Sequence, residues 1–329
     1  MKAPLFWKNK GSLYEKFLSP LAAVYRLITS QREKFTQKIK VPIPVICVGN
    51  IVMGGTGKTP LTKMIATTLK EQGFNAHILS RGYGGNLKGP LLVDVSSHTA
   101  QEVGDEPLLL AQTIPTWIAK NKAKGAKAAT KAGAEILILD DGLQNPMLHK
   151  DFSILVVNGE YGLGNERIFP AGPLREPVEN AIKKVNIIMV MGKDRHVLEK
   201  RWLGVCPIFH GDLHPFENDI QTLKNSPIYA FAGIGHPEKF FAMLRHYGLH
   251  VIAEKAFPDH YFFKSRDLNE LRAQAKHLKA QLVTTEKDFL RLPHDIQSEV
   301  KIIRAHVMIE EESLFSNLIY KAVTHEKKI

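Results

Sequence analysis

Short apolar runs alternate with amphipathic stretches along most of the chain, from about residue 41 onward. The pattern predicts strands over Val41–Gly49, Asn75–Ser80, Glu135–Asp140, Ser153–Val157 and Asn186–Met191, and helices over Lys58–Gln72 and Glu106–Gln112. Apolar strands that are separated by helices are typical of a parallel sheet covered on both faces. The sequence therefore predicts an α/β fold with a mainly parallel sheet.

A second alternating set follows a polar stretch, His214–Ser226, which is the expected linker. This set predicts strands over Ile228–Ala232, His250–Ala256, Gln281–Thr284 and Lys301–Ala305, and helices over Pro237–Tyr247, Ser265–Leu278 and Glu311–Thr324. We therefore expect a larger domain over residues 41–213 and a smaller C-terminal α/β domain over residues 214–329 that closes over a cleft. Clefts between domains often hold substrates.

Residues 1–40 combine apolar and basic side chains. Nine basic and two acidic residues give this segment a local charge of 9 − 2 = +7, out of +11 for the whole chain. Apolar residues recur in it at helical spacing: Leu13, Phe17, Leu21, Val24, Tyr25 and Ile28. A stripe flanked by cations is typical of a helix on an anionic membrane surface, although a helix packed on its own domain has the same pattern. A nucleic-acid arm would have no use for the aliphatic stripe, so we expect no nucleic-acid partner.

The composition is that of an ordinary globular protein, with 44% apolar and 23% charged residues. No apolar run approaches the roughly 20 residues that a membrane span requires, and the start lacks the apolar core of a secretory signal. The two cysteines, Cys47 and Cys206, lie in apolar surroundings and form no CxxC pair. We therefore expect a cytoplasmic protein in a reducing compartment.

The clearest chemical motif lies between the first predicted strand and the first predicted helix, and reads Gly54, Gly55, Thr56, Gly57, Lys58, Thr59. A glycine-rich turn at a helix N-terminus exposes backbone N–H groups to phosphate. Lys58 can reach the β- and γ-phosphates, and the Thr59 hydroxyl can bind Mg²⁺. The common P-loop has its first glycine where this chain has Val52, so the loop is a variant. The motif predicts a nucleoside triphosphate site in a fold of the P-loop NTPase type.

Two carboxylates follow the apolar strand that ends near Leu139. Asp140 and Asp141 emerge at the carboxyl end of that strand, where ligands bind in open α/β sheets. A P-loop site needs an acidic residue there to organise Mg²⁺. We therefore favour a magnesium role for this pair over simple termination of the strand.

Two further residues are candidates for proton transfer. Asp105 opens a helix, where an acidic N-cap is the ordinary interpretation, but in a phosphotransferase a carboxylate near the γ-phosphate can accept the proton of the attacking hydroxyl. His260 follows a strand of the second set and could reach across the cleft, although such a histidine is more often solvated in a turn. Asp105 is the preferred candidate for the base.

Two loops carry arginines that suit an anionic ligand. Arg81 and Tyr83 follow a strand in a glycine-rich loop, and Arg175 lies in a proline-rich turn. Each arginine could contact phosphate or sugar, or could lie in a plain surface turn. The stretch Thr284–Asp288 also follows a strand and loosely matches the base-reading loops of nucleotide-binding proteins.

Taken in chain order, these motifs resemble those of the tetraacyldisaccharide 4′-kinase (lipid A 4′-kinase) family. The matching blocks are Val48–Asn50, Gly54–Pro60, Ser80–Gly84, Val103–Pro107, Leu139–Gln144, Pro170–Glu176, Phe257–Tyr261 and Thr285–Asp288. They cover most of the chain from about residue 41 to 290. One departure is Leu143, where we expect an aromatic residue in many relatives, and it should alter packing more than chemistry.

The resemblance implies a transferase that uses ATP and Mg²⁺ to phosphorylate the 4′-hydroxyl of tetraacyldisaccharide 1-phosphate in lipid A biosynthesis. It also implies a peripheral enzyme on the cytoplasmic face of the inner membrane of a Gram-negative bacterium, with an acylated disaccharide phosphate lipid as substrate. Because acyl chains leave a bilayer at high cost, this favours the membrane interpretation of residues 1–40. No obligatory protein partner is evident.

The resemblance also implies residue roles. Lys58 would hold phosphate, and Thr59 would organise Mg²⁺ with Asp140 or Asp141. Asp105, supported by His260, would activate the sugar hydroxyl. Contacts with the substrate would come from Arg81, Tyr83, Glu106, Gln144 and Arg175.

Two other functions fit parts of the pattern. A membrane-associated ATPase switch would need the P-loop and the acidic strand end, but not Asp105, His260 or Tyr83. A P-loop kinase or ligase for a soluble metabolite would keep the catalytic groups without a use for the amphipathic segment. Deletion of residues 1–30 would distinguish these functions from a lipid kinase.

Overall fold

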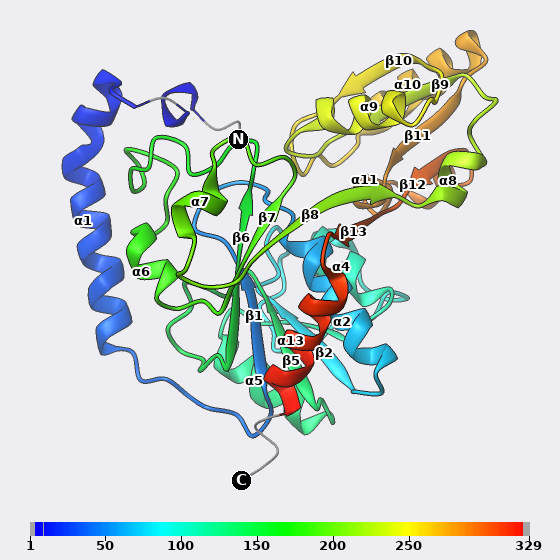
Figure 1. Cartoon of the computed structure of the whole chain (residues 1–329). Coiled ribbons are helices and arrows are strands. Elements are labelled where there is room, and N and C mark those ends of the chain that lie inside the picture. Colours follow the sequence, from blue (N-terminus) through cyan, green and yellow to red (C-terminus); the bar gives the residue numbers. More distant parts are fainter. Residues whose placement is uncertain (1–3, 9, 325–329) are drawn as a thin grey trace.

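One large and one small sheet organise the chain (Figure 1). The structure is a computed structural model that describes residues 4–8 and 10–324. Within this part, the large sheet has the strand order β13 (Ala305–Ile309), β8 (Ile208–Pro215), β7 (Ile187–Met191), β6 (Phe152–Asn158), β1 (Val45–Gly49), β5 (Ile136–Asp140), β2 (Ala76–Ser80), β4 (Thr116–Ile118) and β3 (Leu91–Leu92). The small sheet has the order β10 (Val251–Ala256), β9 (Ile228–Ala232), β11 (Gln281–Thr285) and β12 (Val300–Ile303).

Parallel pairing dominates both sheets. Only the two edge pairs of the large sheet, β3 with β4 and β13 with β8, are antiparallel among the described strands. The central strands β1, β5 and β7 are buried along their whole length, which explains their continuous apolar sequences. The predicted α/β class with a mainly parallel sheet and a second, smaller sheet is confirmed.

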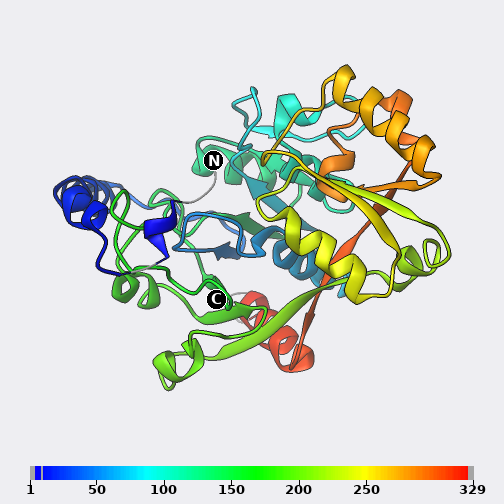
Figure 2. The same ribbon diagram turned by 90° about the horizontal axis from the view of Figure 1, so that it is seen from above.

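Helices cover both faces of each sheet (Figures 1 and 2). One face of the large sheet packs against α2 (Lys58–Glu71), α4 (Asp105–Ala111) and α13 (Glu312–Thr324), and the other against α5 (Lys122–Lys131), α6 (Val178–Ile182) and α7 (Leu198–Trp202). The small sheet lies between α8 (Glu217–Gln221) with α9 (Pro237–His246) and α10 (Ser265–Leu278) with α12 (His294–Gln297). The remaining short helices are η1 (Leu5–Trp7), α3 (Ala100–Val103) and α11 (Glu286–Phe289).

The elements predicted from periodicity agree with the structure to within a few residues at their ends. Four of the described strands escaped prediction: β3, β4, β8 and β13. β4 has only three residues, and β8 includes His210, Asp212 and His214, so its sequence lacks a strong apolar signal. β8 lies between β7 and β13, and its polar side chains stay at least partly exposed.

The boundary of the smaller domain differs from the prediction. The chain leaves the large sheet along β8 and returns along β13, and these two strands pair with each other (Figure 1). Residues 305–324, which the sequence assigned to the smaller domain, therefore belong to the large one, and residues 325–329 lie outside the described part. The reason is a long-range contact, because the apolar stripe of α13 packs on the same face of the large sheet as α2. Periodicity along the chain does not reveal such a contact.

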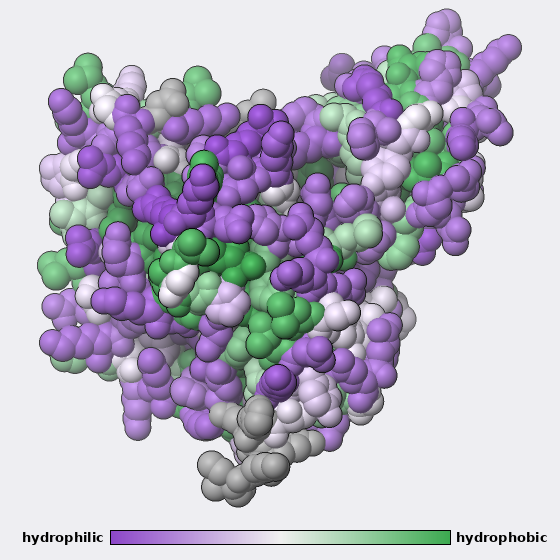
Figure 3. Space-filling view, viewed as in Figure 1, coloured by the Kyte–Doolittle hydropathy of each residue, from purple (hydrophilic) through white to green (hydrophobic). Residues whose placement is uncertain are grey.

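The helix α1 (Leu13–Phe35) runs along the side of the large domain (Figures 1 and 2). From the predicted stripe, Tyr25 packs edge-to-face on Phe169, with ring centroids 5.5 Å apart. The other members are 55–81% exposed: Leu13, Phe17, Leu21, Val24 and Ile28. Green, apolar patches interrupt the mostly purple left edge of Figure 3, where α1 lies. The stripe therefore faces away from the domain.

No helix among the described residues is both long enough and apolar enough to cross a bilayer. The long helix α1 instead has polar anchors at each end. Near its start, Glu15 accepts a hydrogen bond from Arg167, and near its end Glu33 pairs with Lys184 at 2.7 Å. These contacts hold the helix parallel to the surface of the domain.

Candidate active site

The glycine-rich motif forms the loop between β1 and α2, at the carboxyl edge of the large sheet. Gly54 and Gly57 have φ angles of 122° and 88°, which glycine adopts without strain. Gly57 is the N-cap of α2, and Lys58 and Thr59 open the helix. A Cβ atom at Gly57 would lie 3.3 Å from the Met191 side chain, so the loop packs closely against the end of β7. A turn of this kind at a helix N-terminus favours anions.

Neighbouring segments hold this loop in place. The buried Asn50 donates a hydrogen bond to the carbonyl oxygen of Gly54 at 3.3 Å. The backbone N–H of Met53 donates to the carbonyl oxygen of Pro173 at 2.8 Å. The proline-rich segment 170–176 therefore lies directly beside the P-loop, although the two are more than 100 residues apart.

The two carboxylates at the end of β5 have different surroundings. Asp140 is 2% exposed, and its Oδ1 accepts a hydrogen bond from the Thr62 hydroxyl at 3.2 Å. Burial raises the pKa of Asp140 to about 7. Burial also acts on Asp141, but Lys58, 3.8 Å away, and Arg175 hold the pKa of Asp141 below its usual value. Asp141 has a φ of 53°, in the left-handed region that aspartate adopts more readily than most non-glycine residues.

The oxygen atoms beside the P-loop suit a hard cation. Thr59 and Asp140 are both nearly buried, and both come from the P-loop side of the sheet. In the part of the chain that the structure describes, no group of three or more His, Cys, Asp or Glu side chains is arranged to hold a metal by itself. This fits Mg²⁺, which proteins usually bind through one or two carboxylates together with substrate phosphates and water.

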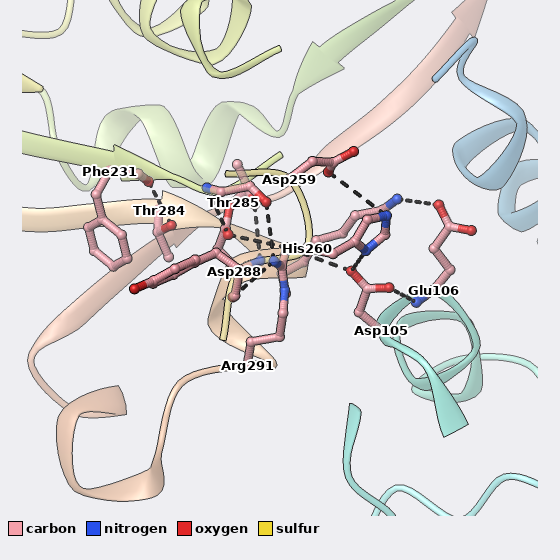
Figure 4. Close-up of polar contacts among 12 residues, drawn as sticks. Asp105, Glu106, Phe231, Asp259, His260, Thr284, Thr285, Asp288 and Arg291 are labelled. Carbon is pink, nitrogen blue, oxygen red and sulfur yellow. Dashed lines mark hydrogen bonds and ion pairs between the residues drawn. The ribbon is translucent and has the colours of Figure 1, made fainter. Parts of the chain in front are cut away.

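A second pair of polar residues joins the two domains (Figure 4). Asp105, at the first turn of α4, accepts a hydrogen bond on Oδ2 from Nδ1 of His260 at 3.0 Å. The other oxygen of Asp105 accepts a hydrogen bond from the backbone N–H of Glu106. Despite burial, the hydrogen bond from His260 and nearby cations lower the pKa of Asp105 to about 2, and the same hydrogen bond raises the pKa of His260 above 6.5. Asp105 is 5% exposed and His260 36%, so the histidine has more contact with solvent.

A buried ion pair supports the loop that carries His260. The Arg291 guanidinium, 1% exposed, lies 3.2 Å from Asp288 and 3.6 Å from Asp105. It also donates hydrogen bonds to the backbone carbonyls of Gly233 and Tyr261 (Figure 4). Buried charges persist when they are paired and hydrogen-bonded in this way. Arg291 therefore fixes the turn on which His260 has a φ of 56°.

Sequence reasoning missed the cations Lys287 and Arg291. The sequence signal for Lys287 was its place in the matching block Thr285–Asp288. The sequence there predicts only a loose match to a base-reading loop. In the structure, Lys287 of the small domain instead pairs with Glu106 of the large domain. Asp288 supports the loop that carries His260. Glu106 was predicted to contact substrate. Its carboxylate pairs with the Lys287 ammonium group, which lowers the pKa of Glu106.

The loop after β2 also reaches the Asp105–His260 pair. The ring of Tyr83 lies edge-on to the His260 ring, with centroids 5.8 Å apart, and is 72% exposed. Gly104 makes this approach possible, because a Cβ atom there would lie 2.5 Å from the backbone oxygen of Tyr83. Arg81 is exposed at the carboxyl end of β2. Tyr83 therefore lies beside the Asp105–His260 pair.

Arg175 and Gln144 lie on the other side of the P-loop. The Arg175 guanidinium contacts both carboxylate oxygens of Asp141, at 2.9 and 3.0 Å. The amide of Gln144 donates hydrogen bonds to the backbone oxygen of Asn50 and to Glu176. Gln144 was predicted to contact substrate, but its amide is engaged within the protein.

Comparison with known proteins agrees with this arrangement. The family model described as Tetraacyldisaccharide-1-P 4′-kinase matches residues 14–324. The chain belongs to the tetraacyldisaccharide-1-phosphate 4′-kinase family. The family resemblance inferred from the motif blocks is thereby confirmed.

Relatives in this family align over nearly the whole chain. The tetraacyldisaccharide 4′-kinase of Rhodospirillum centenum is 44% identical over 323 residues, which cover 97% of this chain and 96% of the relative. That of Gluconobacter oxydans is 43% identical over 308 residues, covering 93% and 94%. Among solved structures, LpxK from Aquifex aeolicus in complex with ATP superimposes with a TM-score of 0.76 at 28% identity, covering 94% of this chain and 100% of that one. The fold and the family therefore agree.

Proposed function

We propose that this protein transfers the γ-phosphate of ATP to the 4′-hydroxyl of a tetraacyldisaccharide 1-phosphate. Membership of the kinase family and the likeness to an ATP-bound LpxK support this function. The observation that carries it is the 3.0 Å contact between Asp105 and His260, which brings a proton acceptor from the small domain to the P-loop side of the cleft. An ATPase switch would have no use for that pair.

The phosphate end of ATP would be held by the P-loop. Its backbone N–H groups and the N-terminus of α2 attract anions, and Lys58 is 12% exposed at this point, partly screened from water. Lys58 would neutralise charge that spreads over the γ-phosphate oxygens in the transition state. Asp141 and Arg175 contact each other beside it and would orient Lys58.

The oxygen donors fit Mg²⁺ as the metal that accompanies ATP. Thr59 and Asp140 would hold it, because a buried carboxylate with a raised pKa is stabilised in its ionised form by an adjacent cation. When bound, Mg²⁺ neutralises charge on the phosphate oxygens. Asp141, held by Arg175, would complete the acidic end of the strand without being the main ligand.

The geometry supports a division of roles between Asp105 and His260 that differs from the sequence-based one. Both oxygens of Asp105 already accept hydrogen bonds, and a carboxylate with a pKa of about 2 is a weak base. In contrast, Nδ1 of His260 faces Asp105, while Nε2 lies 3.8 Å from the Asp259 carboxylate, beyond hydrogen-bond distance. His260 would take the proton of the sugar hydroxyl on Nε2, and Asp105 would orient the ring and stabilise the imidazolium.

The exposed Tyr83 ring beside His260 would pack against the acceptor sugar. Aromatic faces bind the apolar surfaces of ligands in such sites. Arg81, from the same loop, would contact the saccharide or its phosphate. Together these residues would hold the hydroxyl in line with the γ-phosphate.

The helix α1 would bring the enzyme to its lipid at the inner-membrane surface. Its stripe, which includes Phe17, Leu21, Val24 and Ile28, is exposed on a helix that also carries Lys16 and Arg26. Burial of a large apolar side chain in a bilayer stabilises binding by about 1.5–3 kcal/mol, and basic residues add attraction to anionic lipids. The cytoplasmic face, where ATP is present, would be the site of the reaction.

Transfer of labelled γ-phosphate from ATP to tetraacyldisaccharide 1-phosphate in mixed micelles tests this function. The wild type is compared with Lys58→Ala and with Lys70→Ala, a control at an exposed position of the same helix. We expect product from the wild type and from Lys70→Ala, and almost none from Lys58→Ala. ATP binding without any product in the wild type would instead favour a switch or another acceptor.

A further inference from the structure

Lys184 connects three parts of the molecule that are far apart in the sequence. It follows α6, and its Nζ lies 2.7 Å from a carboxylate oxygen of Glu176 and 2.7 Å from one of Glu33, near the end of α1. Glu176 is 8% exposed, so its carboxylate has little access to water. A buried carboxylate needs a cationic partner, and Lys184 supplies one.

The other oxygen of Glu176 points toward the P-loop. It accepts a hydrogen bond from the Gln144 amide at 3.0 Å, and the same amide donates to the backbone oxygen of Asn50 at 2.8 Å. The side-chain oxygen of Gln144 accepts a hydrogen bond from Arg175 at 3.3 Å. Gln144 is thus fixed at both ends, between Glu176 and the strand that leads into the P-loop.

Arg175 extends this chain of contacts to the phosphate site. Its guanidinium holds both oxygens of Asp141, and Asp141 lies 3.8 Å from Lys58. Every link from Lys184 to Lys58 is therefore a polar contact between side chains that are at most half exposed. A chain of this kind can hold each member in one orientation, because moving one partner leaves the next without its hydrogen bond.

We propose that Lys184 is a positioning residue for the phosphate site, which acts through Glu176, Gln144 and Arg175, and that α1 joins the same network through Glu33. The inference rests on the proposed kinase function. Lys184 itself is 29% exposed and lies on the α1 side of Glu176, away from the P-loop, so it would not touch ATP. Lys184 would then help to position both α1, the membrane-facing helix, and the phosphate site.

Kinase activity of Lys184→Met tests the proposal, with Lys183→Met as a matched control at the preceding exposed lysine. We expect kcat to fall about tenfold in Lys184→Met, with KM for ATP changed less than about threefold, because alignment is lost rather than the P-loop itself. Lys184→Arg should recover most of the activity, since it retains the charge. Wild-type kcat in a folded Lys184→Met protein would overturn the proposal.

A double-mutant cycle with Gln144→Met separates positioning from a general loss of packing. If both residues act through one chain, the double variant should lose no more kcat than the worse single variant. Losses that multiply would contradict the proposal. If Lys184→Met does not fold, Lys184→Gln, which keeps a hydrogen-bond donor without the charge, serves in its place.

Amide hydrogen exchange without nucleotide provides a readout that does not depend on activity. In Lys184→Met we expect exchange of the segment 141–146 to accelerate several-fold, while exchange of β9 in the small domain stays as in the wild type. Unchanged exchange in 141–146 would contradict the proposal. Glu33→Gln should give a smaller decrease in kcat than Lys184→Met, and wild-type kcat in Glu33→Gln would remove α1 from the network.

Failure of the kinase function itself would be recognised separately. If neither the wild type nor Lys183→Met makes product, the proposed function fails. If both make product and Lys184→Met does so at the same rate, only the role of Lys184 fails.

Discussion

Asp140 and Asp105 are both almost fully buried, yet their surroundings differ. Asp140 lies at the end of β5 and accepts a hydrogen bond from a neutral hydroxyl, so burial raises its pKa to about 7. Asp105 faces His260 and lies near Lys287 and Arg291, which together overcome burial and lower its pKa to about 2. Lys58 and Lys122 act on Asp140 but do not offset its burial, whereas the partners of Asp105 do.

This difference indicates that the two carboxylates have separate roles in one site. A carboxylate whose burial is not offset within the protein is suited to receive a cation with the substrate, as a magnesium-nucleotide complex would supply. A carboxylate that already holds an imidazole partner is suited to orient a base. The P-loop side of the site would therefore bind phosphate and neutralise its charge. The side that includes the small domain would accept the proton of the attacking hydroxyl.

The comparison predicts its largest effect at Asp140. Asp140→Asn removes the charge that would hold the metal, and loss of several kcal/mol of metal-derived stabilisation corresponds to a decrease in kcat of about 10³-fold. Steady-state kinetics over a range of Mg²⁺ concentrations measures this. Glu135→Gln, one residue before the start of the same strand, is the control and should retain activity. Normal turnover of Asp140→Asn would contradict the assignment of Asp140 as a residue that holds the metal.

Asp105→Asn should have a smaller effect. The amide keeps the shape of the side chain but removes the charge that stabilises the imidazolium, so we expect kcat to fall about 10²-fold. Binding of a fluorescent ATP analogue should change little, because Asp105 supports the base and not the P-loop. A variant that loses ATP binding in proportion to kcat would show that the two sides of the cleft do not work separately.

The exposed stripe of α1 should influence only the encounter with lipid. Phe17→Asp/Ile28→Asp removes two apolar side chains from the stripe, and we expect at least about a tenfold loss of binding to anionic vesicles. Ala23→Asp/Ser30→Asp, which adds the same charge to exposed positions away from those residues, is the control. Vesicle sedimentation measures binding, and equal losses in both variants would mean that charge rather than the stripe decides it.

The smallest expected effect is a shift in the pH profile. Since Asp105 raises the pKa of His260 above 6.5, the base would be protonated and inactive at pH values below that raised pKa. Activity should therefore fall as the pH decreases through this range. Asp105→Asn removes the cause of the shift, so its acid limb should move to lower pH. An unmoved limb in kcat/KM profiles would contradict the role of His260 as the base.

The sequence predicted the P-loop side more completely than the side with His260. Gly54–Thr59 follows β1, and Asp140 and Asp141 stand at the end of β5, its parallel neighbour in the sheet; parallel strands place their carboxyl ends at the same edge. The pairing of Asp105 with His260 joins residues 155 positions apart, and only family resemblance suggested it. Arg291 escaped prediction because a single buried arginine has no local pattern.

The same reasoning explains the errors in the fold. Strands with continuous apolar sequences, such as β1 and β5, were identified, whereas β8 was not because its polar residues mask it. The return of β13 and α13 to the large sheet depends on contacts between distant segments. Sequence periodicity indicates which face of an element is buried, but not which partner buries it.

The central claim is that His260, from the small domain, takes the proton of the hydroxyl that attacks a phosphate held by the large domain. Single-turnover transfer of labelled phosphate by His260→Ala, alongside binding of an ATP analogue, tests it most directly, with His277→Ala as the control at an exposed position of α10. We predict that His260→Ala retains its melting temperature and nucleotide affinity while transfer slows by about 10²–10⁴-fold. Transfer at the wild-type rate by a folded His260→Ala protein would contradict the account.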